Sequence, residues 1–303
     1  MKITLICILA FILDSILGEW QSFHPLVGFG SLANTLEKLS NKGNFLKIKG
    51  LLAVLILVLP LPLLIFFKLP NNFLGDCISV FCLYLTIGSK SLKEHSTKIA
   101  TALEHSNLNL ARQNLSLIVS RDTTNLNETS IVKATIESVL ENGNDAIFAP
   151  LFWFILAGPA GAILYRGVNT LDAMWGYKNA NFYNFGWAAA KSDDLMNLIP
   201  ARLTALSYSI LGDFKHAISC WFTQGNKWYS PNAGPVMASG AGALNITLGG
   251  DAVYDGVLKT RPQLGLGREP IYNDISLANN LINKTIYLWL GATLTFNLLR
   301  KLC

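Results

Sequence analysis

The chain has 303 residues, of which 51% are hydrophobic and only 14% are charged. This composition, with a positive mean hydropathy, lies outside the usual range of soluble domains and makes a lipid bilayer the first environment to consider. The net charge of +5 suits basic loops on the cytoplasmic side of a membrane, and no stretch interleaving basic and aromatic residues indicates nucleic-acid binding.

Five apolar runs are candidates for membrane helices, because a spanning helix needs about 20 mostly apolar residues. Each carries at most one charge, and they cover residues 3–17, 51–67, 69–89, 146–165 and 275–299. The first is not expected to be a signal peptide, since Asp14 interrupts it and no small-residue cleavage site follows. For residues 146–165, a buried helix of a soluble protein remains the alternative.

The remaining patterns are also helical. Between residues 90 and 141 apolar residues recur at helical spacing, for example Ile99, Leu103 and Leu110, and strand signals are few. The five cysteines show no C-x-x-C spacing and no association with the four histidines, which argues against a metal or disulfide framework. We therefore expect an all-α, polytopic integral membrane protein, with residues 1–303 forming a single integral membrane domain with polar cytoplasmic loops.

The distribution of Lys and Arg predicts the topology. Basic residues concentrate in residues 18–49 and 90–145, which places both segments on the cytoplasmic side. Seven charged residues follow between residues 165 and 202. Burying all of them in lipid would cost on the order of 20 kcal/mol, so this stretch is expected to be a loop or to line a water-facing cavity.

Residues 146–165 are expected not to cross the bilayer directly, despite their length. Pro150, Gly158, Pro159 and Gly161 offer places to bend or break the segment. A re-entrant or buried helical segment would return the chain to the side it left. The charged residues before and after it would then face one compartment, the cytoplasm.

Two motifs in the first half of the chain carry groups suited to chemistry. Asp14 and Gly18 precede His24-Pro25, a set that can bind a metal or polar substrate but can equally be a helix end and a turn. Farther on, Arg121-Asp122 precede Glu137 and Glu141, and Asp145 continues their spacing of four. Three carboxylates on one helix face repel one another, so a bound cation or lysines from elsewhere must compensate them.

A third cluster combines cationic, amide and carboxylate groups. Arginine suits phosphate oxygens, whereas carboxylates and amides suit a hard cation such as Mg²⁺. Its members are Arg166, Asn169, Thr170, Asp172, Lys178, Asp193, Asp194, Asn197 and Arg202. A fourth, glycine-rich region begins at Ser230-Pro231-Asn232, and no P-loop motif is present.

Long motifs in order along the chain resemble the CobD/CbiB family. The main ones are Tyr165-Arg-Gly-Val-Asn-Thr-Leu-Asp-Ala-Met-Trp-Gly-Tyr-Lys178 and Asp193-Asp-Leu-Met-Asn-Leu-Ile-Pro-Ala-Arg202. The resemblance extends to Asp14 with His24-Pro25, Ser120 to Thr123, Glu137-Ser138 with Glu141-Asn142, and Ser230 to Gly234, and so covers nearly the whole chain. One departure is Gly18-Glu19-Trp20, where the family typically has Gly-Asp-Pro.

The resemblance implies an ATP-dependent acid–amine ligase of cobalamin biosynthesis, adenosylcobinamide-phosphate synthase. Such an enzyme joins (R)-1-amino-2-propanol O-phosphate to the propionate of adenosylcobyric acid, with Mg²⁺ assisting phosphoryl transfer. Expected partners are the lipid bilayer, the corrinoid, ATP and the amine phosphate, together with other membrane enzymes of the corrinoid pathway. The expected location is the bacterial inner membrane, with the active site facing the cytoplasm.

The resemblance to the family, together with the chemistry of each side chain, implies roles for individual residues. Expected catalytic residues are Asp122, which would take a proton from the amine, and Glu137, Glu141, Arg166 and Lys178. Expected substrate- and phosphate-binding residues are His24, Arg121, Asn169, Thr170, Arg202, Ser230 and Asn232. Expected metal ligands are Asp172, Asp193, Asp194 and Asn197.

Two other interpretations remain open. A non-enzymatic membrane sensor resembling the AmpE proteins would not need the filled Asn-Thr-Leu-Asp172 and Asp193-Asp-x2-Asn197 clusters. A transporter would carry charged residues within several spans, whereas here the charges gather in loops.

Overall fold

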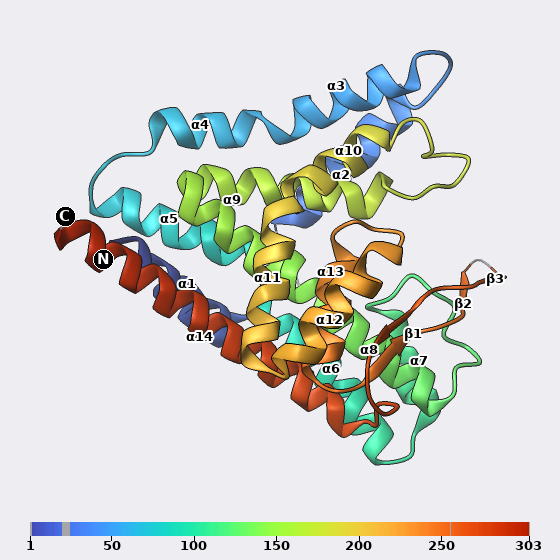
Figure 1. Ribbon diagram of the computed structural model, residues 1–303. Helices are drawn as coiled ribbons and strands as arrows, with labels where there is room; N and C mark the ends of the chain where they lie inside the picture. Colours follow the sequence, from blue (N-terminus) through green and yellow to red (C-terminus); the bar gives the residue numbers. More distant parts are fainter. Residues whose placement is uncertain (1, 20–24, 255, 303) are drawn as a thin grey trace. The chain divides into compact units, whose positions relative to one another are not determined.

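The computed structural model describes residues 2–19, 25–254 and 256–302 and is mainly helical (Figure 1). The chain divides into two compact units. Unit 1 comprises Met1–Ser89 and Asp145–Asn197, and unit 2 comprises Lys90–Asn144 and Leu198–Cys303. The helical fold class is confirmed for most of the chain, while the expectation of one integral membrane domain stays a prediction.

Unit 1 consists of helices that pack around a hydrophobic core of mostly Ala and Val side chains with two buried aromatic rings. Its helices are α1 (Lys2–Leu17), α2 (Pro25–Ser40), α3 (Leu46–Val58), α4 (Pro60–Lys68), α5 (Phe73–Thr86), α9 (Ala149–Trp175) and α10 (Trp187–Met196). Helix α9 lies beside α5 and also packs against α4 and α10 (Figure 1). The rings of Trp175 and Phe185, 5.1 Å apart and edge to face, lie at the centre of the core.

Helix α9 is broken where the sequence predicts a break. Ala157 and Gly158 have non-helical dihedral angles, and Gly158 has a φ of 63° and a ψ of −158°, a conformation open essentially to glycine alone. In a continuous helix, residues 153 and 161 would be about 12 Å apart along the axis. Here a Cβ on Gly161 would lie only 2.4 Å from the carbonyl oxygen of Trp153, so the chain folds back on itself at this point.

Within the described residues, three helical stretches are long and apolar enough to cross a membrane, judged by length and composition. They are Leu46–Lys68, Phe73–Glu104 and Glu128–Trp175. The first is the most apolar, yet only 28% of its most apolar window is buried. Its exposed side chains include Ile56, Phe66 and Phe67, and such a surface requires a lipid or protein cover.

Unit 2 packs its helices around α13 (Ala233–Ala243), of which all 11 residues are buried. Small residues allow close contact, since a Cβ at Gly240 would approach Leu140 to 2.6 Å. The other helices are α6 (Ser89–Glu104), α7 (Leu108–Ser116), α8 (Glu128–Gly143), α11 (Leu198–Leu211), α12 (Phe214–Gln224), η2 (Gly225–Lys227) and α14 (Asn273–Leu302). A π-helical turn, η1 (Asn144–Phe148), connects α8 to α9.

Side-chain caps fix the starts of three unit 2 helices. The side chains of Asn107, Asn127 and Asp213 accept hydrogen bonds from the third backbone N–H of α7, α8 and α12, respectively. These contacts satisfy donors that the first helical turn leaves without a partner.

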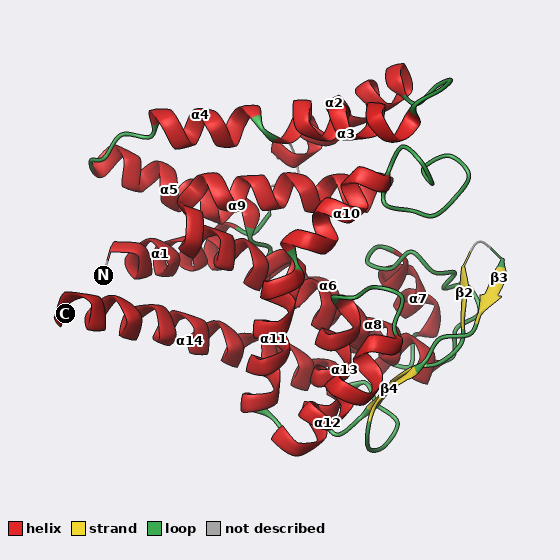
Figure 2. Ribbon diagram, turned by 45° about the horizontal axis from the view of Figure 1, so that its top comes forward, coloured by secondary structure: helices red, strands yellow, loops and turns green. Residues whose placement is uncertain are grey.

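Two short antiparallel sheets in unit 2 were not predicted from the sequence. Strand β1 (Thr247–Gly249) pairs with β4 (Gln263–Gly265), and β2 (Ala252–Tyr254) pairs with β3 (Val257–Lys259). Figure 2 shows the β2–β3 hairpin as the yellow strands at the edge of this unit. Strands of three residues are too short to produce a readable alternation of polar and apolar residues.

The break in α9 yields a prediction about backbone strain. A Cβ at Gly158 meets nothing within 4 Å, so Gly158→Ala should destabilise the protein by about 1–3 kcal/mol through its dihedral angles alone. Gly291→Ala in α14 is the matched control, because its site is equally open and helical; it should stabilise by about 0.5–1 kcal/mol. Thermal unfolding in detergent tests both, and equal effects of the same sign would contradict the strain.

Candidate functional site

A buried ionic cluster in unit 2 is centred on Glu137, a residue of α8 that is only 2% exposed. Its Oε1 accepts hydrogen bonds from the backbone N–H of Gly249 at 2.8 Å and from Arg261 Nη2 at 3.3 Å. Its Oε2 accepts from Arg261 Nη1 at 3.0 Å and from Arg121 Nη2. We call Arg121, Glu137, Gly249 and Arg261 the Glu137 cluster. Among the described residues, the side chains that form salt bridges with Glu137 are the two arginines.

Arg261 was missed by the sequence analysis. Its side chain is almost fully buried, and its Nε donates to the carbonyl oxygen of Gly250 at 2.8 Å. Its guanidinium carbon also lies 5.0 Å from the ring centre of Trp228, a cation–π contact. The glycine-rich stretch around it was noted, but a single sequence carries no signal that pairs Arg261 with a carboxylate more than 100 residues away.

The neighbouring residues Arg121 and Asp122 differ in their surroundings. Burial alone would lower the pKa of Arg121, but the charge and hydrogen bond of Glu137 outweigh it and raise the pKa, with a smaller effect from Glu141. Asp122 is solvent-exposed, and hydrogen bonds from the side chain and backbone of Thr124 lower its pKa. A carboxylate with a lowered pKa is a weaker base, so this environment does not favour the proton-accepting role expected for Asp122.

A second polar group in unit 2 brings together Arg202, Ser230 and Asn232, and we call it the Arg202 cluster. Arg202 Nη1 donates to Asn232 Oδ1 and to the carbonyl oxygen of Leu198 at 3.2 Å. Ser230 Oγ accepts from the backbone N–H of Asn232 at 3.3 Å and of Ala233 at 3.1 Å, at the start of α13. These three residues were all expected to bind substrate or phosphate, and the structure places them in contact.

In unit 1, residues of the two longest motifs meet around Asp193. Asn169 Nδ2, on α9, donates to Asp193 Oδ1 at 3.2 Å, and Asn197 Nδ2, after α10, donates to Asp193 Oδ2 at 3.0 Å. Tyr165 Oη donates to Asn197 Oδ1 at 3.0 Å. We call Tyr165, Asn169, Asp193 and Asn197 the Asp193 cluster; Tyr165 was not among the expected site residues.

The electrostatics of Asp193 differ from those of Glu137. Burial raises the pKa of Asp193 above the ordinary carboxyl value, the two amide hydrogen bonds oppose this shift, and the charge of Asp194 adds to it. Asp194 itself lies 3.2 Å from Lys191 in a salt bridge. Asp193 therefore has neutral donors where Glu137 has two guanidinium groups.

The other expected residues of unit 1 are less tightly grouped. Arg166 Nε is buried and has no hydrogen-bond partner among the described residues, whereas Thr170 Oγ1 donates to the Arg166 carbonyl oxygen at 2.7 Å. Asp172 is half-buried near the end of α9, and Lys178 is exposed in the following loop. His24 lies outside the described residues.

In the described part of the chain, no three His, Cys, Asp or Glu side chains gather closely enough to hold a metal ion by themselves. The binding of a metal by Asp172, Asp193, Asp194 and Asn197 stays a prediction. Mg²⁺ commonly needs only one or two carboxylates when substrate phosphates supply the other ligands.

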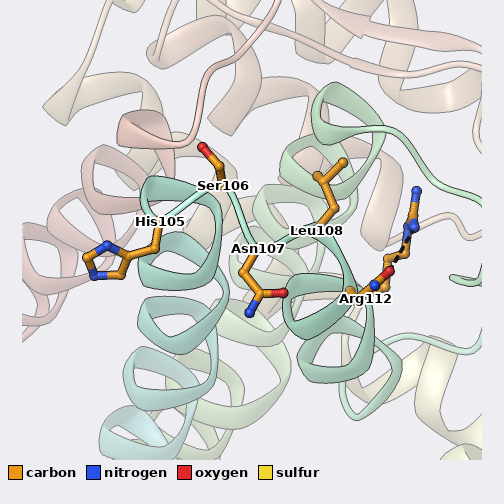
Figure 3. Close-up of a pocket in the computed structure, with 6 residues that line it drawn as sticks. His105, Ser106, Asn107, Leu108 and Arg112 are labelled. Carbon is orange, nitrogen blue, oxygen red and sulfur yellow. Dashed lines mark hydrogen bonds between the residues drawn. The ribbon is translucent and has the colours of Figure 1, made fainter.

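A surface cavity of about 560 Å³ lies at the connection of α6 and α7. None of the expected site residues lines it. Figure 3 shows the side chains of His105 and Arg112 pointing to opposite sides of this connection, so they do not converge on a common ligand.

Known proteins resemble this chain over nearly its full length. The family model described as CobD/Cbib protein matches residues 7–282. A protein of Stutzerimonas stutzeri named cobalamin biosynthesis protein CobD is 49% identical, covering 96% of each chain. Relatives of the same name from Chromobacterium violaceum and Leptospira interrogans are 47% and 39% identical and cover 94% and 85% of each chain.

This helical, largely apolar chain with polar clusters thus matches biosynthetic proteins, and these relatives do not favour the sensor interpretation. The chain belongs to the CobD/CbiB family of cobalamin biosynthesis proteins, as the resemblance implied. No solved structure matches the chain.

The Glu137 cluster predicts a large loss of stability on neutralisation. Glu137→Gln would leave two buried guanidinium groups without their carboxylate, which should lower the free energy of unfolding by about 3–5 kcal/mol. Glu269→Gln is the control, because this carboxylate is 69% exposed in its salt bridge with Lys133; it should change stability by less than about 1 kcal/mol. Thermal unfolding measures both, and a similar small change in each would show that the buried charge is not needed.

Proposed function

We propose that the chain is an adenosylcobinamide-phosphate synthase. It would join (R)-1-amino-2-propanol O-phosphate to the propionate carboxylate of adenosylcobyric acid in an ATP-dependent reaction. Family membership supports the pathway. The observation that carries the reaction is the Asp193 cluster, because it joins Asn169 of one long motif to Asp193 of the other, so that polar residues of both motifs meet at one place in unit 1.

The chemistry requires activation of the carboxylate, since a carboxylate and an amine do not condense usefully in water. A propionate oxygen attacks the γ-phosphorus of ATP, ADP leaves, and an acyl phosphate forms. The free amine then attacks the acyl carbon, inorganic phosphate leaves, and the amine loses its extra proton. Mg²⁺ enters as part of the MgATP substrate and reduces the charge of the phosphates during transfer.

The roles of individual residues follow from their contacts. Arg202 is our proposed phosphate ligand in unit 2, because its partner is a neutral amide and not a carboxylate. Arg121 pairs with Glu137, so its role is to position the segment that precedes α8. Asp172 and Asp194 are the proposed contacts for MgATP, which needs few protein carboxylates.

The assay that tests this function uses purified protein with ATP, magnesium, adenosylcobyric acid and the amine phosphate. We expect ATP hydrolysis to depend on both other substrates and to match the amide product detected by mass spectrometry. Asp172→Asn should abolish product formation without unfolding the protein, whereas Glu94→Gln, at an exposed residue of α6, should not affect it. Folded wild-type protein that forms no amide at any magnesium concentration would favour a regulator.

We also propose that the chain is a multi-pass protein of the cell membrane whose polar clusters face the cytoplasm. Support comes from the three long apolar stretches and the exposed apolar side chains of α3 and α4. ATP is a cytoplasmic substrate, and the reversal of α9 at Gly158 suits a segment that leaves and re-enters on one side.

Thiol labelling tests this orientation in a variant without the five native cysteines. Ala180→Cys, after α9, should react with an impermeant reagent only when cells are permeabilised. Asn71→Cys, in the exposed turn between α4 and α5, should react in intact cells, because this turn has few basic residues. Labelling of position 180 from outside would reverse the proposed orientation.

A further inference from the structure

The buried Glu137 of unit 2 and the half-buried Asp193 of unit 1 are compensated in different ways. Glu137 accepts hydrogen bonds from two arginines and a backbone N–H, so its charge is neutralised within the protein. Asp193 accepts only from the amides of Asn169 and Asn197. In the described residues, no cationic side chain lies within salt-bridge distance of Asp193. Its negative charge therefore remains available to a positively charged ligand.

Asp193 also retains hydrogen-bonding capacity. An ionised carboxylate offers about four acceptor positions, and the two amides occupy one on each oxygen. The amide of Asn197 cannot easily rotate, since its oxygen already accepts from Tyr165 at 3.0 Å and its nitrogen faces Asp193. The cluster therefore holds the carboxylate in a fixed orientation with acceptor positions to spare.

These details favour an ammonium group over a metal ion. A magnesium ion needs octahedral oxygen ligands at about 2.0–2.1 Å. Both amides beside Asp193, those of Asn169 and Asn197, turn their nitrogen atoms and not their oxygens to the carboxylate, and the oxygen of Asn197 also accepts from Tyr165. An ammonium group carries three N–H donors, of which two can fill the two remaining acceptor positions of the carboxylate.

A cationic group, the guanidinium of Arg166, lies on α9 near Asn169 of the Asp193 cluster. Arg166 precedes Asn169 by three residues on α9, so the two share one helix face. The Nε atom of Arg166 is buried and has no hydrogen-bond partner among the described residues, an arrangement that costs free energy unless a ligand satisfies it. Guanidinium groups suit phosphate oxygens, which accept two parallel N–H bonds.

We propose that the Asp193 cluster and Arg166 form the binding site for the amine substrate, with Asp193 contacting its ammonium group and Arg166 its phosphate. This assignment rests on the proposed function, and it replaces the expected metal-binding roles of Asp193 and Asn197. The ligand class is a small primary amine that carries a phosphate ester on an adjacent carbon.

Direct binding to the purified full-length protein tests the assignment without catalysis. Calorimetric titration is carried out in EDTA, without ATP, using 1-amino-2-propanol O-phosphate and two analogues. Isopropyl phosphate lacks only the amine, and 1-amino-2-propanol lacks only the phosphate. The wild-type protein should bind the complete ligand without magnesium and more tightly than either analogue.

Two variants separate the two contacts. Asp193→Asn should weaken binding of the amine phosphate at least about tenfold, as expected for one charge-assisted hydrogen bond, and leave isopropyl phosphate unaffected. Arg166→Gln should weaken both phosphates and leave 1-amino-2-propanol unaffected. Glu94→Gln, which removes an exposed carboxylate, is the control, and the melting temperature of each variant reports whether it is folded.

Three outcomes would overturn the assignment. They are unchanged affinity in folded Asp193→Asn, binding that requires magnesium and disappears in EDTA, and no binding by the wild-type protein. The proposed function is tested separately, by the formation of amide product. If amide product forms while Asp193→Asn binds normally, only the assignment is wrong; if the binding pattern holds but no product forms, the amine phosphate site stands and the synthase activity does not.

Discussion

A carboxylate that leaves water must be compensated by cations or hydrogen-bond donors, and this constraint organises the polar interior of both units. In unit 2, Glu137 draws its donors from three places far apart in the sequence: Arg121 before α8, Gly249 at the end of β1, and Arg261 before β4. One side chain thus ties the glycine-rich strand region to the helical core. We interpret Glu137 as a structural residue that positions its neighbours.

Asp193 meets the same constraint with neutral amides. Amide donors stabilise the carboxylate without cancelling its charge, which is why burial still raises its pKa. Such a site is less stable by itself than an arginine-paired one, but it can gain free energy when a cation binds. The difference between the two clusters separates a residue that holds the fold from one that is suited to a ligand, although both stood out in the sequence as acids within long motifs.

The sequence predicted local features better than distant contacts. The break at Gly158 followed from adjacent Gly and Pro residues. The spacing of four between Asp193 and Asn197 is that of one helix face, and Asn197 Nδ2 lies 3.0 Å from Asp193 Oδ2. The pairing of Glu137 with Arg261 was not predictable, because it depends on a chain reversal with no periodic signal. The short strands escaped prediction because glycine dihedral angles and main-chain pairing form them, with little contribution from side-chain pattern.

The contact between Arg261 and the carbonyl oxygen of Gly250 closes the base of the β2–β3 hairpin. Because this contact and Glu137 hold the two ends together, the exposed strand β3 adds little to the stability of the unit, and its Val257 and Leu258 bury no core surface. The entropy of closing a loop grows only slowly with its length, so doubling this one would cost about 0.6 kcal/mol. The hairpin is therefore a place where the chain can accept insertions while the core of the unit keeps its packing.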